Sequence, residues 1–227
     1  MKRTQIELLL LAQTALCILM VLLRNTSDGW FSGHWAQLAS LQVWEPPHFL
    51  FLGWNLFLAW IPFGLAAVFS SARGNAQRIS TLLLWLLFLP NAPYLITDLI
   101  HLRPHNSVPL WYDAALLFSA AWTGLLLGYC SLLKVESGLR SWWGRRYANA
   151  FVGLALLLSG FGIYLGRFLR WNSWDAFLHP ISLLEDILGL MGRPSSLLLS
   201  LCVTLLFSTI LGLGYHTIFT LSKREGS

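Results

Sequence analysis

Long apolar stretches constrain this chain more than any other feature of its sequence. A helix that crosses the hydrocarbon core of a bilayer needs about 20 largely apolar residues. Six stretches come close to that length or exceed it, and none has a run of charges through its centre. They cover residues of about 6–23, 49–69, 79–100, 112–133, 149–168 and 197–221. We therefore predict an all-α polytopic bundle of six transmembrane helices that forms one membrane domain over residues 1–227.

The composition agrees with a membrane protein. Hydrophobic residues make up 56% of the chain and charged residues 11%, whereas a soluble domain has about 25% charged residues. A formal net charge of +5 would suggest nucleic-acid binding in a soluble protein. Here the basic residues flank apolar stretches, and no basic patch alternates with aromatic residues as it does in a nucleic-acid groove. We predict a lipid bilayer as the partner and no nucleic acid.

The basic residues are divided unequally between the two sides of the predicted bundle. The N-terminus, residues 70–78, residues 134–148 and the C-terminal tail together hold ten of the fifteen Lys and Arg residues. Because Lys and Arg concentrate on the cytoplasmic side of membrane proteins, we predict an inner (plasma) membrane protein with both termini in the cytoplasm. The acids show the opposite bias, since seven of the ten lie on the predicted outer side.

Two prolines interrupt the third apolar stretch half-way along its length. Pro90 and Pro93 enclose Asn91 and Ala92 in a segment that is otherwise apolar. Proline removes a helical hydrogen bond and disfavours the α conformation of the residue before it. We predict a kink or two half-helices here, with Asn91 as the cap of the second half. Unwound backbone at this depth must face protein or a water-filled cavity, so the break marks either a packing kink or a polar site.

Three motifs resemble the signature of a known family. They are LPNAPYLITDLIHL at residues 89–102, WYD at residues 111–113 and GRFLRWNSWD at residues 166–175. Together they are similar to the hallmarks of a family of bacterial multi-pass membrane proteins known as domain of unknown function 1361. The resemblance covers nearly the whole chain and implies a membrane location with several spans. It implies no activity and assigns no catalytic residue.

Polar residues converge at the outer ends of spans three, four and five. Asp98 and His101 are three residues apart and share a helix face, as do Arg167 and Arg170. A charge near the hydrocarbon boundary is costly unless it is paired, so we expect one of these arginines to pair with Asp98 or Asp113. The predicted binding pocket consists of Asn91, Asp98, His101, Asp113, Arg167, Arg170, Asn172 and Asp175.

Several roles are compatible with this pocket. It is an ion-pair cluster that fixes helix ends, or it binds a lipid headgroup, a small solute or a partner protein. Arginines beside aromatic residues suit an anionic lipid or a lipid-linked ligand. Alternatively, Asp98, His101 and Asp113 ligate a divalent metal such as Zn²⁺, in an enzyme that acts on an envelope or lipid-linked substrate. The broken helix also fits a transporter, and an assembly subunit of a membrane complex is a further alternative.

Two further predictions concern the surroundings of this pocket. Asn55 lies within span two. Because a buried amide needs partners, we expect Asn55 to have a structural role, with a hydrogen bond to another helix or to the break at Asn91. Pro90 and Pro93 are the other residues with a predicted structural role. The outer loops at residues 24–48 and 169–196 are each long enough for a short helix on the membrane surface. In the second loop, Pro180 is placed to begin such a helix and Gly189 to end it.

Overall fold

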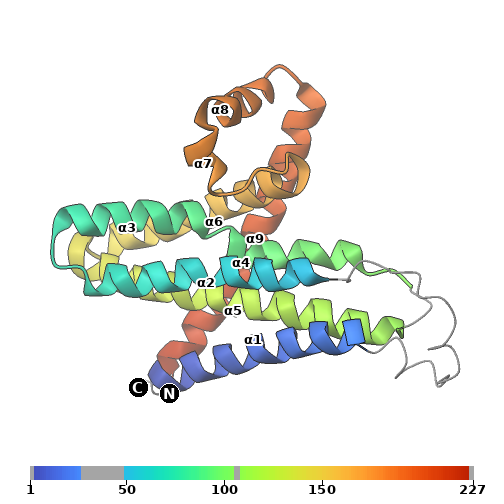
Figure 1. The fold of residues 1–227 in the computed structure, drawn as a ribbon. Helices are drawn as coiled ribbons and strands as arrows, with labels where there is room; N and C mark the ends of the chain where they lie inside the picture. The colour runs from blue at the N-terminus through green and yellow to red at the C-terminus, as the bar shows by residue number, and fades with distance from the viewer. Residues whose placement is uncertain (1–2, 27–48, 105–107, 225–227) are drawn as a thin grey trace, which may run out of the picture.

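The structure is a computed structural model that describes residues 3–26, 49–104 and 108–224. Every regular element in this part of the chain is helical (Figure 1). The elements are α1 (Arg3–Thr26), α2 (Leu50–Ser71), α3 (Asn75–Phe88), α4 (Asn91–Tyr94), the 3₁₀ helix η2 (Leu95–His101), α5 (Leu110–Trp143), α6 (Arg145–Phe168), α7 (Asp175–Leu178), α8 (Pro180–Gly189) and α9 (Pro194–Arg224). The surface helix predicted within residues 24–48 falls, beyond Thr26, outside the described residues.

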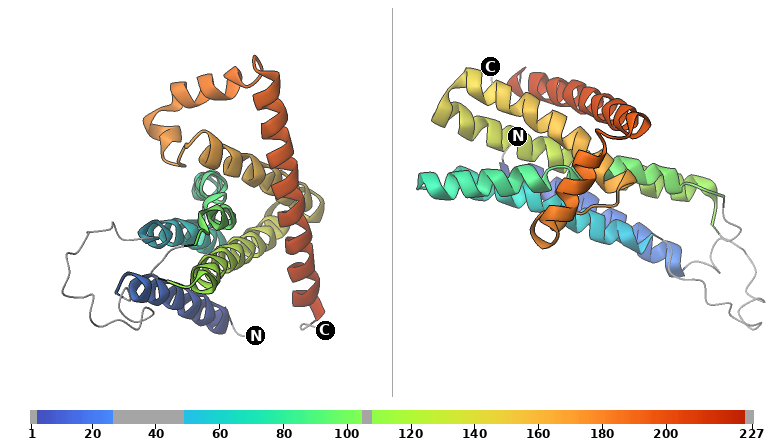
Figure 2. Two further views of the ribbon diagram at one scale, coloured as in Figure 1. Left: turned by 90° about the vertical axis from the view of Figure 1, so that its right-hand side faces the viewer. Right: turned by 90° about the horizontal axis from the view of Figure 1, so that it is seen from above.

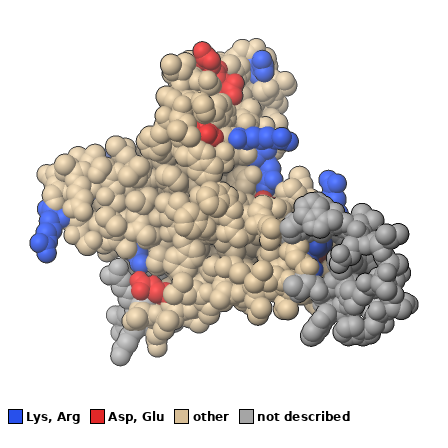
Figure 3. Space-filling model, viewed as in Figure 1, with Lys and Arg blue, Asp and Glu red and all other residues tan. Residues whose placement is uncertain are grey.

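Within the described residues, six helical stretches are long and apolar enough to cross a membrane. They are Thr4–Asn25, Leu50–Ser71, Asn75–His101, Leu110–Trp143, Arg145–Phe168 and Pro194–Leu221. The predicted all-α bundle of six spans is therefore confirmed, and the chain is a multi-pass membrane protein. The face of the molecule in Figure 3 agrees, because its few charged side chains lie near the ends of the bundle and beside α7 and α8.

The fourth span is longer than the sequence predicted. α5 continues for ten residues beyond residue 133 to Trp143, and only Gly144 separates it from α6. Gly144 has φ 86°, a left-handed conformation that glycine adopts without a Cβ clash. Glu136 and Arg140 in the extension form a salt bridge of 2.6 Å one helical turn apart. Their charges reduce the hydropathy of the segment without breaking the helix, because such pairs stabilise helices.

α5 lies at the centre of the bundle, where it packs against α1, α2, α4, η2 and α6. One buried cluster includes Trp85, Leu132, Val135, Leu139 and Ile163. A second buried cluster includes Leu52, Leu56, Leu95, Leu116 and Leu117. α9 packs mainly against α6 and crosses the other helices at a steep angle (Figure 2). The bundle is thus organised around α5, and α9 lies on the outside of α6.

Glycines of two helices allow the broken third span to approach closely. A Cβ added to Gly124 of α5 would clash with the carbonyl oxygen of Ala92 and lie 2.6 Å from Leu95 Cδ1. A Cβ added to Gly162 of α6 would lie 2.5 Å from Pro90 Cγ. Small residues let membrane helices approach at backbone distance. The break is therefore held from two sides by α5 and α6.

Candidate functional site

Side chains replace the backbone hydrogen bonds that are lost where α3 ends and α4 begins. At the break the Ala92 N–H donates to the Leu89 carbonyl at 3.2 Å, so it does not serve the Phe88 carbonyl that it would reach in an unbroken α-helix. Asn91 Nδ2 donates to the Phe88 carbonyl at 3.0 Å, and Ser173 Oγ donates to the Leu87 carbonyl at 3.0 Å. Asn91 Nδ2 also donates to Ser173 Oγ at 2.9 Å. The predicted break is present, but the predicted capping role of Asn91 is wrong, since its amide bonds back into α3.

The segment after α6 folds back along the bundle to reach this break. α6 ends at Phe168, Arg170 adopts a left-handed φ of 61°, and the Trp171 N–H donates to the Leu165 carbonyl at 3.1 Å. A left-handed residue just past the last turn is a common way to end a helix, and here it reverses the chain direction. The reversal brings Ser173 to the break in the third span.

α8 has the predicted bounds of Pro180 and Gly189. Its place differs from the predicted one, however. In Figure 1 and in the right-hand view of Figure 2, α7 and α8 lie beside the middle of the bundle and not beyond its end. The contacts of Ser173 explain this arrangement, because they join the preceding segment to α3 and α4. The end of the bundle that holds His101 and Phe168 is called the outer end below, after the predicted orientation.

Between the break and the outer end, the third span is wound as a 3₁₀ helix. η2 is seven residues long, whereas 3₁₀ segments longer than about four residues are uncommon. Side chains three residues apart eclipse one another in this conformation. Asp98 and His101 therefore stack in one row, and the tighter winding strengthens the shared face that their spacing predicts.

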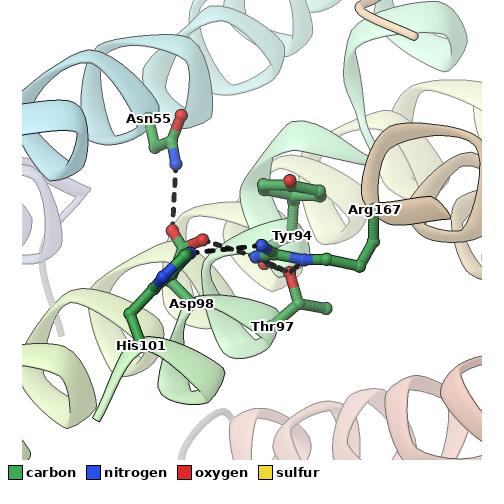
Figure 4. A network of polar contacts seen from close by, with 6 residues as sticks. All are labelled: Asn55, Tyr94, Thr97, Asp98, His101 and Arg167. Atoms are coloured by element: carbon green, nitrogen blue, oxygen red, sulfur yellow. Dashed lines mark hydrogen bonds and ion pairs between the residues drawn. The ribbon is translucent and has the colours of Figure 1, made fainter. Parts of the chain in front are cut away.

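Arg167 and Asp98 form the ionic core of the site (Figure 4). Arg167 Nη2 lies 2.6 Å from Asp98 Oδ1, and Asn55 Nδ2 donates to Asp98 Oδ2 at 2.9 Å. The Asp98 side chain is only 2% exposed, whereas that of Arg167 is 18% exposed. The pair joins α6 to η2, and Asn55 adds α2, so the amide of span two bonds across to another helix as expected. The carboxylate is enclosed, and the guanidinium extends towards a cavity.

Three more side chains fix the orientation of the Arg167 guanidinium. Thr97 Oγ1 accepts hydrogen bonds from Nε at 3.0 Å and from Nη2 at 2.5 Å. His101 Nε2 lies 3.4 Å from Nη1, and the Tyr94 ring lies beneath the guanidinium at 4.8 Å. An arginine has five N–H donors; Thr97 and Asp98 engage three of them, and His101 engages a fourth in the tautomer whose Nε2 is an acceptor. One donor remains for a ligand.

A cavity of about 550 Å³, called the cleft below, lies against this network. The cleft is lined by five of the eight predicted pocket residues: Asn91, Asp98, His101, Arg167 and Asn172. Arg170 lines an adjoining cavity of about 490 Å³. Asp113 and Asp175 line neither cavity, and Asp175 instead accepts hydrogen bonds from the backbone and side chain of Asn172.

The rest of the cleft is an apolar groove between α3 and α6. Its wall consists of Leu83, Leu86, Leu87, Leu158, Phe161 and Leu165, and Leu183 of α8 closes one side. Leu83 is 63% exposed and Leu158 is 37% exposed on the outside of the bundle. The groove therefore opens sideways onto the surface that faces lipid, while its other end reaches the Arg167 network.

Comparison with protein families gives a match over residues 54–210, to the family described as "Protein of unknown function (DUF1361)". The chain belongs to this family. No curated protein and no solved structure gives a match. The matched region contains every residue of the cleft except Phe51. In this DUF1361 chain, the motifs at residues 89–102 and 166–175 meet in space. The first contains the helix break and Asp98, and the second contains Arg167, which pairs with Asp98, and Ser173, which bonds at the break.

The third motif of the DUF1361 chain belongs to a separate ion pair. Asp113 accepts hydrogen bonds from Arg24 Nε at 2.7 Å and from Arg24 Nη2 at 3.0 Å. The two side chains are 1% and 0% exposed, so the pair is sealed between α1 and α5. The prediction that Asp113 joins the pocket is wrong, and Arg24 was missed. The available signal was its position at the outer end of span one, on the same side as Asp113.

This separation also removes the predicted set of metal ligands. Asp98 and His101 both contact Arg167, but Asp113 is bound to Arg24 elsewhere in the bundle. Within the described residues, no three His, Cys, Asp or Glu side chains are grouped closely enough to hold a metal ion. The structure therefore does not assemble the proposed site.

Proposed function

We propose that the DUF1361 chain binds a membrane amphiphile in the cleft, with the polar head at Arg167 and the apolar tail along the groove. The observation that carries this proposal is the continuity of the cavity. One end has a fixed guanidinium with a donor to spare, and the other end has a wall of leucines that opens towards lipid. A solute from water would not need the apolar part.

The dimensions of the groove support a ligand that comes from one leaflet. Leu83 precedes Asp98 by 15 residues, which is roughly 22–24 Å along a span that is part α-helix and part 3₁₀ helix. One leaflet contributes about 15 Å to a hydrocarbon core of about 30 Å. A tail that lies in the groove can therefore stay parallel to its neighbours in the bilayer while its head reaches the polar end.

We also propose that the cleft faces the outer side of the inner membrane. The ends of the helices opposite the cleft carry most of the basic residues, including Arg73, Arg78, Arg140 and Arg145. Lys and Arg favour the cytoplasmic side. A fusion of alkaline phosphatase after Lys223 should be inactive and a fusion after Arg193 active. Activity of the first fusion would contradict the orientation.

The ligand proposal is tested by filling the cleft. Ala176 lines the cleft, and Ala176→Trp would occupy it with an indole. Ala115 is exposed on α5 and lines no described cavity, so Ala115→Trp is the matched control. In nanodiscs that contain a photoreactive phospholipid, labelling of the α3 and α6 peptides should fall strongly in the Ala176→Trp protein alone. Equal labelling of both variants and the wild type would contradict binding in the cleft.

A further inference from the structure

The second cavity differs from the cleft in the chemistry of its wall. It has a volume of about 490 Å³ and is lined by Tyr94, Ile100, His101, Arg103, Gly166, Arg167, Arg170 and Asn172. Three of these residues are arginines, one is a histidine and none is an Asp or Glu. We call this space the arginine cavity. Tyr94, His101, Gly166, Arg167 and Asn172 also line the cleft, so the two cavities adjoin at the guanidinium of Arg167.

Two carboxylates of the segment after α6, those of Asp175 and Asp186, bond to other groups. Asp175 accepts hydrogen bonds from Asn172, and Asp186 accepts one from Trp171 Nε1 at 2.9 Å. Within the described part of the chain, Arg170 has neither a hydrogen bond nor an ion pair. Its side chain is exposed and lines the arginine cavity. Among the described residues, no carboxylate lies within ion-pair distance of the Arg170 guanidinium, so this positive charge is presented to the cavity.

The backbone of Arg170 gives a second reason to assign a role to its side chain. At φ 61° it occupies the left-handed position that ends a helix, where glycine is the usual residue because a Cβ is strained there. An arginine at this position keeps a charged group at the mouth of the cavity at the expense of backbone strain. Strained residues of this kind cluster at ligand sites.

We propose that the arginine cavity binds the phosphate of a phosphomonoester or diphosphate head, whose tail lies in the groove. This inference rests on the proposed function and adds the class of the headgroup. The planar fork of arginine suits phosphate oxygens in bidentate contacts. A zwitterionic head would bring an ammonium group into a wall in which no described lining residue is an Asp or Glu. The site therefore selects an anionic head over a zwitterionic or uncharged one.

Competition between lipids tests the headgroup class. The full chain in phosphatidylcholine nanodiscs is labelled with a photoreactive phosphatidic acid, and the competitors are unlabelled phosphatidic acid, diacylglycerol and inorganic diphosphate. Phosphatidic acid should compete at least about tenfold more strongly than diacylglycerol, the effect of one charge-assisted hydrogen bond. It should also compete more strongly than inorganic diphosphate, because the free anion lacks the tail. Equal competition by diacylglycerol would overturn the headgroup inference. Equal competition by diphosphate would keep the phosphate site and contradict the tail in the groove.

Variants separate this inference from the proposed function. Arg170→Gly removes the charge and relaxes the backbone, so the protein should fold, and Arg103→Gln is a second test. Arg193 is exposed between α8 and α9 and lines neither cavity, which makes Arg193→Gly the matched control. Both cavity variants should lose the preference for phosphatidic acid over diacylglycerol, while the control keeps it. An unchanged preference in both cavity variants overturns the arginine cavity as the headgroup site, even where Ala176→Trp still abolishes labelling and so supports the cleft.

Discussion

Among the described residues, two Arg–Asp ion pairs join helices of the bundle, and their surroundings are opposite. Arg24 and Asp113 are 1% and 0% exposed, and two parallel hydrogen bonds connect them. Arg167 is 18% exposed and divides its donors among Asp98, Thr97 and His101 at the wall of a cavity. The same pair of residue types thus serves in one place to join two helices and in the other to present a guanidinium to a ligand.

The comparison shows that the position of a charge within a predicted span is a poor guide to its role. Both pairs lie near the outer end of the bundle, and both satisfy the requirement that a charge near hydrocarbon be paired. The two pairs differ in whether a cavity adjoins them. Arg167 lines both the cleft and the arginine cavity, whereas Arg24 lines neither. The first two experiments below remove one partner from each pair.

The largest loss of stability is expected for Arg24→Gln. This change removes the guanidinium that donates two hydrogen bonds to the buried Asp113 carboxylate, and breaking a buried ion pair costs about 3–5 kcal/mol in proteins. Thermal unfolding in detergent should show the loss, while any folded protein keeps its lipid labelling. The double variant Arg24→Met with Asp113→Leu should recover most of the stability, because both charges are removed together. No recovery in the double variant would show that the pair does more than join α1 to α5.

A smaller loss of stability and a larger loss of binding are expected for Arg167→Gln. Asp98 keeps its hydrogen bond from Asn55, so we expect a cost of about 1–3 kcal/mol, the penalty for a buried group that loses one of its hydrogen-bond partners. Photolabelling of the cleft should fall to the background level. Arg167→Lys should not restore it, because an ammonium group cannot reproduce the fork of contacts to Thr97 and Asp98. Full labelling in the lysine variant would show that a positive charge alone is sufficient.

Ser173→Ala should have a modest effect that is confined to the cleft. The hydroxyl donates to the Leu87 carbonyl and accepts from Asn91, and such bonds in membrane bundles are worth about 0.6 kcal/mol on average. Hydrogen exchange of the backbone at residues 87–91 should increase, because the fold-back is less firmly held. Ser182→Ala in α8 is the control, since Ser182 is exposed. Faster exchange in the control as well would indicate that α7 and α8 move as a whole.

A small change of opposite sign is expected for Arg170→Gly. Relief of the left-handed backbone should stabilise the protein by about 1 kcal/mol, visible as a slightly higher unfolding temperature. The same variant is expected to lose its preference for an anionic head. A gain of stability with a loss of selectivity would show that the arginine is kept for binding. A loss of stability would instead show that its side chain holds the end of α6.

Hydropathy was sufficient to predict the spans, because lipid requires long apolar helices with internally bonded backbones. It failed for α5 beyond residue 133, where Glu136 and Arg140 lower the hydropathy of a segment that remains helical. The prolines predicted the break correctly, since their effect is local. The hydrogen bond from Ser173 to Leu87 joins residues 86 apart, and no local pattern announces it. The fold-back of the segment after α6 was missed for this reason.

The site was predicted in part, for a reason that is also physical. Spacing shows which residues share a helix face, and this grouped Asp98 with His101 and Arg167 with Arg170. It does not show how each helix is rotated towards its neighbours. From the sequence, Asp98 and Asp113 were therefore equally good ion-pair partners for Arg167 and Arg170. The rotation of α1 decides between them by directing Arg24 to Asp113. The left-handed conformation of Arg170 gives no sequence signal, because glycine is the residue expected there.

The most direct test of the account compares the two ion pairs in one binding measurement. Photoreactive phospholipid is cross-linked to the wild type, to Arg167→Gln and to the Arg24→Met, Asp113→Leu double variant in nanodiscs, and labelled peptides are mapped. We predict that label concentrates on the α3 and α6 peptides that line the groove, is lost in Arg167→Gln and is retained in the double variant. Label spread over all lipid-facing helices and unchanged in both variants would contradict a ligand site at the cleft.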